Sequence, residues 1–107
     1  MKIKYKQLRL LIINIFRKHN LNLTHAKICA DALVNAELAG APSHGLSRLK
    51  MYCGRIQKKL INPEPKIKIK KISPSIAHVD AHHAIGFVAA DIAIKTAINN
   101  AKKTGIG

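Results

Sequence analysis

The chain has 107 residues, of which 48% are hydrophobic and 4% aromatic, and its formal net charge is +14. This length suits one domain at most, and the hydrophobic content excludes a disordered chain. The core must be aliphatic, because the sequence has no Trp and only two Tyr and two Phe. The charge attracts polyanions, but the basic residues are spread along the chain without interleaved aromatic residues, which disfavours a nucleic-acid-binding module.

The first helix is expected at residues 5–18, where apolar side chains recur at helical spacing. They are Leu8, Leu11, Ile12, Ile15 and Phe16. The apolar run is short, contains Asn14 and lacks a small-residue cleavage site, so it resembles neither a signal peptide nor a membrane span. We therefore expect a cytoplasmic protein with no membrane contact.

A second helix is expected at residues 25–39, with Thr24 as its N-cap and Gly40 at its end. Its predicted buried residues are Cys29, Ala32, Leu33 and Ala36. The two cysteines, Cys29 and Cys53, fall on apolar helical positions and match no metal-ligand spacing. Both are predicted to be buried free thiols in a reducing compartment.

The third helix is predicted to start at the motif SHG, with Ser43 as its N-cap, and to run to about Leu60. On a helical wheel that starts at His44, Arg48 lies near 40° and Tyr52 near 80°, so the three side chains share a face. The opposite face is apolar and comprises Leu46, Leu49, Cys53, Ile56 and Leu60. Such a face suits a small anionic substrate, with Arg48 binding a carboxylate and His44 exchanging a proton. An ordinary solvated polar face is the alternative interpretation.

Two strands and a fourth helix are expected after the third helix. Residues 66–72 alternate Lys and Ile, which predicts a strand with one exposed face, and residues 76–80 predict a more buried strand. A helix at 87–103 is capped by Gly105, and the Ile-Gly that follows predicts an incoming strand. The inward face of this helix is predicted to comprise Ala90, Ile94, Ala97, Ile98 and Ala101. The sequence therefore looks like part of a larger α/β domain.

Three histidines lie around the second predicted strand and its following loop. His78, His82 and His83 have only Asp80 as a further nearby ligand, so no metal site is expected. Gly86 alone is too weak a signal for a nucleotide-binding loop, and a turn or close-packing role is favoured.

Two segments resemble the malate/L-lactate dehydrogenase family, a group of NAD(P)-dependent 2-oxo acid reductases distinct from the Rossmann-type lactate and malate dehydrogenases. They are ADALVNAELAGAPSHGLSRLKMYCGRIQKKLINPEP and IAHVDAHHAIGFVAADIAIKTAINNAKKTGIG. The resemblance spans nearly the whole chain and is most specific at SHG, Arg48 and the spacing to Tyr52. Ala81 and Ala84 stand where glycine is common in the family.

The resemblance implies roles for four residues. His44 is the expected proton donor to the substrate carbonyl oxygen, Arg48 the ligand of the substrate carboxylate, and Tyr52 and Ser43 their neighbours. It also implies hydride transfer between NAD or NADP and a small 2-oxo or 2-hydroxy acid, in a homodimer. Family members are considerably longer, and their second active-site histidine and main nicotinamide-binding loops lie beyond this chain. The cofactor-binding residues are thus unknown, and we expect the isolated chain to be inactive.

The sequence as a whole predicts an α/β fold in the form of an α+β fragment. Residues 1–62 are expected to form a helical region of three helices that carries SHG. Residues 63–107, with two short strands and a helix, are expected to begin a larger α/β oxidoreductase domain. A small basic nucleic-acid-binding module and a non-functional gene remnant are the alternatives to a dehydrogenase.

Overall fold

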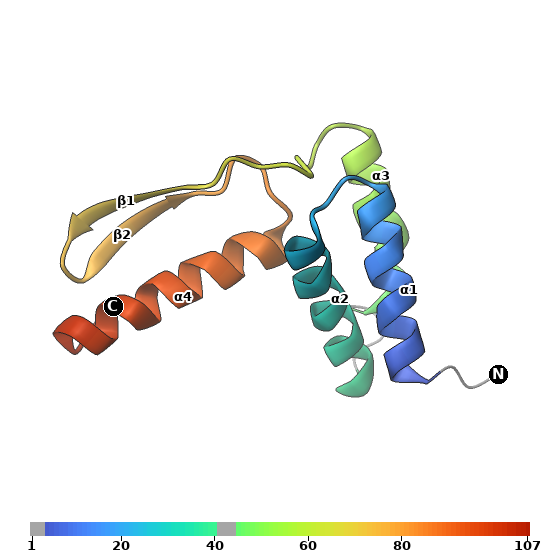
Figure 1. Cartoon of the computed structure of the whole chain (residues 1–107), viewed down its shortest axis with the longest axis horizontal. Coiled ribbons are helices and arrows are strands. Elements are labelled where there is room, and N and C mark those ends of the chain that lie inside the picture. Colours follow the sequence, from blue (N-terminus) through green and yellow to red (C-terminus); the bar gives the residue numbers. More distant parts are fainter. Residues whose placement is uncertain (1–3, 41–44) are drawn as a thin grey trace.

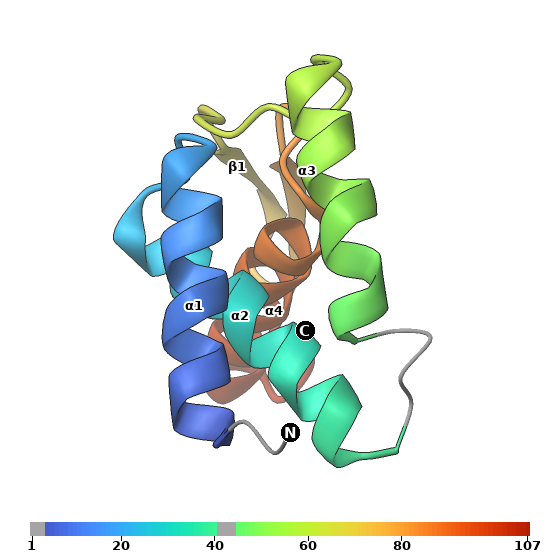
Figure 2. The ribbon, with the colours of Figure 1, turned by 90° about the vertical axis from the view of Figure 1, so that its right-hand side faces the viewer.

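The computed structural model describes residues 4–40 and 45–107 of the chain (Figure 1). Its elements are α1 (Tyr5–Lys18), α2 (Leu23–Leu38), the 3₁₀ helix η2 (Leu46–Arg48), α3 (Leu49–Gln57), β1 (Lys68–Ser73), β2 (Ile76–Asp80) and α4 (Gly86–Thr104). Helices α1, α2 and α3 form a bundle, and α4 with the β1–β2 hairpin forms an arm that extends from it (Figures 1 and 2). The predicted order of three helices, two strands and a helix is confirmed, as is an α+β fold.

The core of the bundle lies between α1 and α2, which are the helices in most extensive contact. Its buried residues are Leu8, Ile12, Ile13, Phe16, Leu21, Ala26, Cys29, Ala30, Leu33, Val34, Ile56, Ile85 and Val88. Ala26, Cys29 and Ala30 are small, so α2 can approach α1 closely enough to enclose Phe16 and Ile12 completely. The predicted bounds of α1 are confirmed, but Leu11, predicted to face inward, is 52% exposed.

Helix α2 starts two residues earlier than predicted, because Asn22 and not Thr24 is its N-cap. The Asn22 side-chain oxygen accepts a hydrogen bond from the backbone N–H of His25 at 2.8 Å, which satisfies one of the free donors of the first turn. Thr24 lies inside that first turn. Gly40, with a φ of +75°, follows the last turn as predicted.

Helix α3 is shorter than predicted at both ends. Residues 46–48 form a 3₁₀ turn, and the α-helix proper begins at Leu49 and ends at Gln57. Lys59 then adopts a left-handed backbone with a φ of +62°, and the N–H of Leu60 donates to the carbonyl of Arg55 at 2.9 Å. This Schellman closure ends the helix before Leu60, which is 64% exposed instead of facing inward. Leu46, 37% exposed, lies off the apolar face because the 3₁₀ turn shifts its angle.

The strands β1 and β2 pair antiparallel in a two-stranded hairpin, with Ile69 opposite Val79 and Lys71 opposite Ala77. Strand β2 lies as predicted, whereas β1 starts at Lys68. Figure 1 shows the hairpin lying along α4, and β2 is the strand that contacts this helix. None of the helices in the described part of the chain is long and apolar enough to cross a membrane.

Helix α4 ends as predicted at Gly105, whose φ is +84°. Its predicted inward face is only partly covered. Ile94 and Ile98 are 59% and 50% exposed, and Ala90 is exposed as well. The prediction that these three residues face a core is wrong, because the hairpin and α2 contact other sides of the helix.

Candidate functional site

The structure places only part of the predicted site. Ser43 and His44 lie outside the described residues. Arg48 is half-buried at the junction of η2 and α3, and its backbone N–H donates to the carbonyl of Gly45 at 3.0 Å. The α-helical wheel does not apply across this 3₁₀ turn. A shared face for His44 and Arg48 therefore stays a prediction.

The turn at Gly45, the last residue of the SHG motif, is held by Glu37, a residue that the sequence analysis did not identify. Its side-chain Oε1 accepts a hydrogen bond from the backbone N–H of Leu46 at 2.8 Å. Gly45 is buried beneath the same carboxylate, and a Cβ at this position would lie 2.6 Å from Oε1 and 2.9 Å from Cδ of Glu37. Gly45 therefore allows the Glu37 carboxylate to approach the backbone closely, and its φ of −103° lies outside the left-handed region. The available signal was that Glu37 is the last acidic residue before SHG.

Tyr52 differs from its predicted setting. The wheel put it on an exposed polar face, but its ring is half-buried and packs against the hydrophobic core. The ring meets Phe87, in the first turn of α4, edge to face, with centroids 5.3 Å apart and an interplanar angle of 63°. Tyrosine combines an apolar ring with a polar tip, so this packing serves the contact between α3 and α4 and is compatible with a hydroxyl that reaches solvent.

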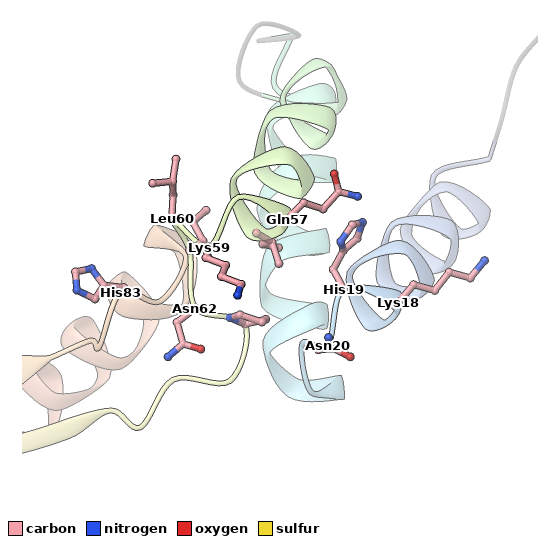
Figure 3. Close-up of a pocket in the computed structure, with 11 residues that line it drawn as sticks. Lys18, His19, Asn20, Gln57, Lys59, Leu60, Asn62 and His83 are labelled. Atoms are coloured by element: carbon pink, nitrogen blue, oxygen red, sulfur yellow. The ribbon is translucent and has the colours of Figure 1, made fainter.

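A second candidate site is a basic cavity of about 780 Å³ at the opposite end of α3 (Figure 3). It is lined by Lys18, His19, Asn20, Ile56, Gln57, Lys59, Leu60, Ile61, Asn62, Pro63 and His83, and none of these described residues is acidic. In Figure 3, Lys59 and His19 point into the space between the helices, whereas Lys18 and His83 extend away from it. The lining includes lysines but no arginine, and an arginine can bind a carboxylate through two parallel hydrogen bonds whereas a lysine cannot, so the segment around Arg48 is the stronger candidate.

The histidines after β2 shape a loop. The backbone N–H of His82 donates to the Asp80 carboxylate at 3.0 Å, and the His82 Nδ1 accepts from the backbone N–H of Lys66 at 3.0 Å. His82 and His83 both have a left-handed backbone, with φ of +51° and +58°. Across residues 4–40 and 45–107, no three His, Cys, Asp or Glu side chains converge as a metal site requires.

Gly86 opens α4, and no atom lies within 4 Å of where its Cβ would be, so other residues do not crowd the backbone there. Cys29 is fully buried, and burial raises the pKa of its thiol to about 12. Cys53 is only half-buried, against the prediction, and its thiol pKa is also raised by burial.

Comparison with known proteins decides between a dehydrogenase and a nucleic-acid-binding module. The family profile of malate/L-lactate dehydrogenases matches residues 3–107. The chain belongs to the malate/L-lactate dehydrogenase family. The nucleic-acid-binding alternative is not favoured by any relative described below.

Members of the malate/L-lactate dehydrogenase family from archaea and bacteria are similar to nearly the whole chain. The L-sulfolactate dehydrogenase of Methanocaldococcus jannaschii is 40% identical over 97 residues, which are 91% of this chain and 28% of that protein. The NAD(+)-dependent ureidoglycolate dehydrogenase of Escherichia coli (strain K12) is 36% identical over 106 residues, which are 99% of this chain and 30% of that protein. The chain thus spans less than a third of the length of these relatives.

The fold agrees with that of solved members of the malate/L-lactate dehydrogenase family. The structure of the malate dehydrogenase from Pyrococcus horikoshii matches all of this chain with a TM-score of 0.95 and 37% identity, and the match covers 31% of that enzyme. The sulfolactate dehydrogenase structure from Methanocaldococcus jannaschii gives a TM-score of 0.93 with 38% identity. The chain therefore has the shape of one part of a larger dehydrogenase.

Proposed function

We propose that this chain forms the substrate-binding part of an enzyme that interconverts a small 2-oxo acid and the corresponding 2-hydroxy acid. The observation that carries the proposal is the family match over residues 3–107, a range that includes the SHG motif and Arg48. Malate, sulfolactate and ureidoglycolate, which the relatives' names contain, are all 2-hydroxy carboxylates. A substrate of this class needs one group for its carboxylate and one for its oxygen at carbon 2.

The proposed roles follow from the chemistry of these two groups. The guanidinium of Arg48 binds the carboxylate through two parallel hydrogen bonds, a geometry that a lysine does not provide. His44 gives a proton to the carbonyl oxygen during reduction and takes it back from the hydroxyl during oxidation. The hydroxyls of Ser43 and Tyr52 add hydrogen bonds that orient the acid. Glu37 acts on the turn and not on the substrate.

The cofactor of the proposed reaction is NAD or NADP, which supplies or accepts the hydride. The chain spans less than a third of the length of its relatives, and the proposal assigns to it only the substrate side. We accordingly propose that the 107-residue chain is inactive alone. The proposal extends to a cytoplasmic homodimer for the intact enzyme, with a helical region up to residue 62 and an α/β region after it.

Substrate binding by the isolated chain tests the proposal. Pyruvate is titrated into ¹⁵N-labelled chain while the amide signals of residues 45–52 are followed by NMR. Arg48→Gln should weaken binding at least tenfold, because loss of a charge-assisted hydrogen bond costs about 1.5–3 kcal/mol and 1.4 kcal/mol corresponds to a factor of ten. Arg55→Gln, at an exposed position of the adjoining helix α3, is the matched control and should leave the affinity unchanged. Equal affinities for Arg48→Gln and the wild type would refute the role of Arg48.

The inactivity of the chain is tested separately. Purified chain with pyruvate and NADH or NADPH should show no steady oxidation of the reduced nicotinamide. Turnover that disappears in His44→Ala would contradict this part of the proposal while supporting the role of His44.

A further inference from the structure

The basic cavity at the C-terminal end of α3 brings together three segments that lie far apart in the sequence. Its lining residues come from the end of α1 and the turn after it, from the end of α3 and the segment that follows, and from the loop after β2. Its volume of about 780 Å³ falls within the range that small-molecule sites usually have. The cavity is therefore large enough for a small organic ligand.

The walls of this cavity are held by backbone hydrogen bonds. Helix α1 ends in the same Schellman closure as α3, and the N–H of Leu21 donates to the carbonyl of Phe16 at 3.2 Å. The segment after α3 is joined to the loop after β2, because the N–H of Asn62 donates to the carbonyl of His83 at 2.8 Å. A ligand would thus meet walls that are already formed, as at most small-molecule sites.

Lys59 occupies a backbone position of the cavity that favours glycine. The residue after a Schellman-closed helix is left-handed, and glycine or asparagine usually stands there. Asn20 has this place after α1, with a φ of +73°, whereas Lys59 has it after α3, with a φ of +62°. A residue with a long side chain is strained in this conformation, and strained residues cluster at ligand-binding sites. The Lys59 ammonium points into the space between the helices (Figure 3), which indicates a role for it inside the cavity.

The charges around the cavity favour an anion. The C-terminal ends of α1 and α3 together carry roughly one negative charge, but four basic residues stand at these ends, namely Arg17, Lys18, Lys58 and Lys59. None of the described residues that line the cavity is acidic. A basic residue in the last turn suffices to compensate a helix end, so Lys59, which follows the helix, is left for a ligand.

The kinds of donor in the lining suit a phosphate group. A lysine binds phosphate as a point charge, as it does in many phosphate sites. His19 and Gln57 extend toward each other from the ends of α1 and α3 (Figure 3) and offer further N–H donors. Apolar side chains lie in the same lining: Ile56 is buried, and Ile61 is half-buried against the core.

We propose that this cavity is a binding site for a small phosphate monoester with an apolar body. The Lys59 ammonium and the side chains of His19 and Gln57 bind the phosphate oxygens. The organic part of the ligand packs on Ile56 and Ile61. A bare phosphate ion would fill only a small part of the 780 Å³, and it would leave this apolar surface exposed to water.

Binding of phenyl phosphate to the chain tests the proposal. The compound is titrated into ¹⁵N-labelled chain at constant ionic strength, and inorganic phosphate is titrated in parallel. The amide signals of residues 19–20 and 57–62 should shift and saturate together. Phenyl phosphate should bind at least about threefold more tightly than inorganic phosphate, because burial of the ring removes apolar surface from water.

Variants at the end of α3 locate the phosphate. Lys59→Gln should weaken the binding of phenyl phosphate about fivefold or more, through loss of a charge-assisted hydrogen bond. Lys58→Gln removes the same charge from the neighbouring exposed residue, which does not line the cavity, and should weaken binding less than about twofold. Lys59→Gly should weaken binding as much as Lys59→Gln while the Tm stays unchanged or rises, because glycine suits the left-handed backbone.

Arg48→Gln separates this site from the reaction proposed above. The cavity does not include Arg48, so this variant should bind phenyl phosphate at residues 57–62 like the wild type even if it loses pyruvate binding. Circular dichroism checks that each variant is folded. The proposal is overturned if phenyl phosphate does not shift the signals of the lining residues, or if inorganic phosphate binds equally tightly. It is also overturned if Lys58→Gln and Lys59→Gln weaken binding equally, since the net charge alone would then account for the affinity.

Discussion

Replacing Gly45 with alanine tests whether Glu37 holds the turn at Gly45 and Leu46. The added Cβ would lie 2.6 Å from Glu37 Oε1, a distance that forces the carboxylate to move and to release the N–H of Leu46. Loss of this hydrogen bond to a charged acceptor at a partly exposed position should cost about 1–2 kcal/mol. For a chain of this size, each kcal/mol corresponds to a shift of roughly 4–8 °C in Tm.

Gly54→Ala is the matched control, because it lies within α3 and no atom lies within 4 Å of its Cβ position. Removing a glycine from a helix interior should stabilise the chain by about 0.5–1 kcal/mol. Thermal and urea unfolding, followed by circular dichroism, should therefore show opposite signs for Gly45→Ala and Gly54→Ala. Two changes of the same sign would refute the packing explanation.

A double-mutant cycle with Glu37→Ala tests whether the Cβ added at position 45 acts through the Glu37 carboxylate. When the carboxylate is absent, the Cβ at position 45 has space, so the effects of Gly45→Ala and Glu37→Ala should not add. We expect a coupling free energy of about 1 kcal/mol. Additive effects would show that Gly45→Ala destabilises the turn for another reason.

Three further predictions concern the helical bundle. Asn22→Ala should lower the free energy of unfolding by about 1 kcal/mol through loss of the N-cap of α2. Thr24→Ala should change this free energy by less than about 0.5 kcal/mol, as surface substitutions usually do. A larger loss of stability in Thr24→Ala than in Asn22→Ala would show that Thr24 is the cap. Burial lowers the pKa of His25 below its ordinary 6.5, so the folded state binds fewer protons than the unfolded state, and the Tm should fall as the pH falls below 6.5. This fall should be smaller in His25→Gln, and an unchanged pH dependence would contradict the assignment. Ellman's reagent at pH 8 should label Cys53 much faster than Cys29, whose pKa is raised to about 12, and Cys53→Ser should remove the faster phase.

The candidate site was predicted only in part, because its chemistry and its support come from different elements. The motif around Arg48 is contiguous in the sequence, so it can be recognised from residue types and spacing. Glu37 lies on another helix, and its role depends on how the chain returns between α2 and η2. The contact of Tyr52 with Phe87 joins residues 35 positions apart, and no periodic pattern within α3 predicts this contact.

The sequence by itself determined the order of the elements, the bounds of α1 and β2, and the glycine ends of α2 and α4. These features depend on local spacing and on the left-handed backbone of Gly40 and Gly105, which neighbouring residues suffice to predict. Tertiary structure decided which apolar faces are covered. The stripe at Ile94 and Ile98 has the spacing of a buried face, but burial requires a partner surface, and the elements of this chain pack elsewhere on α4.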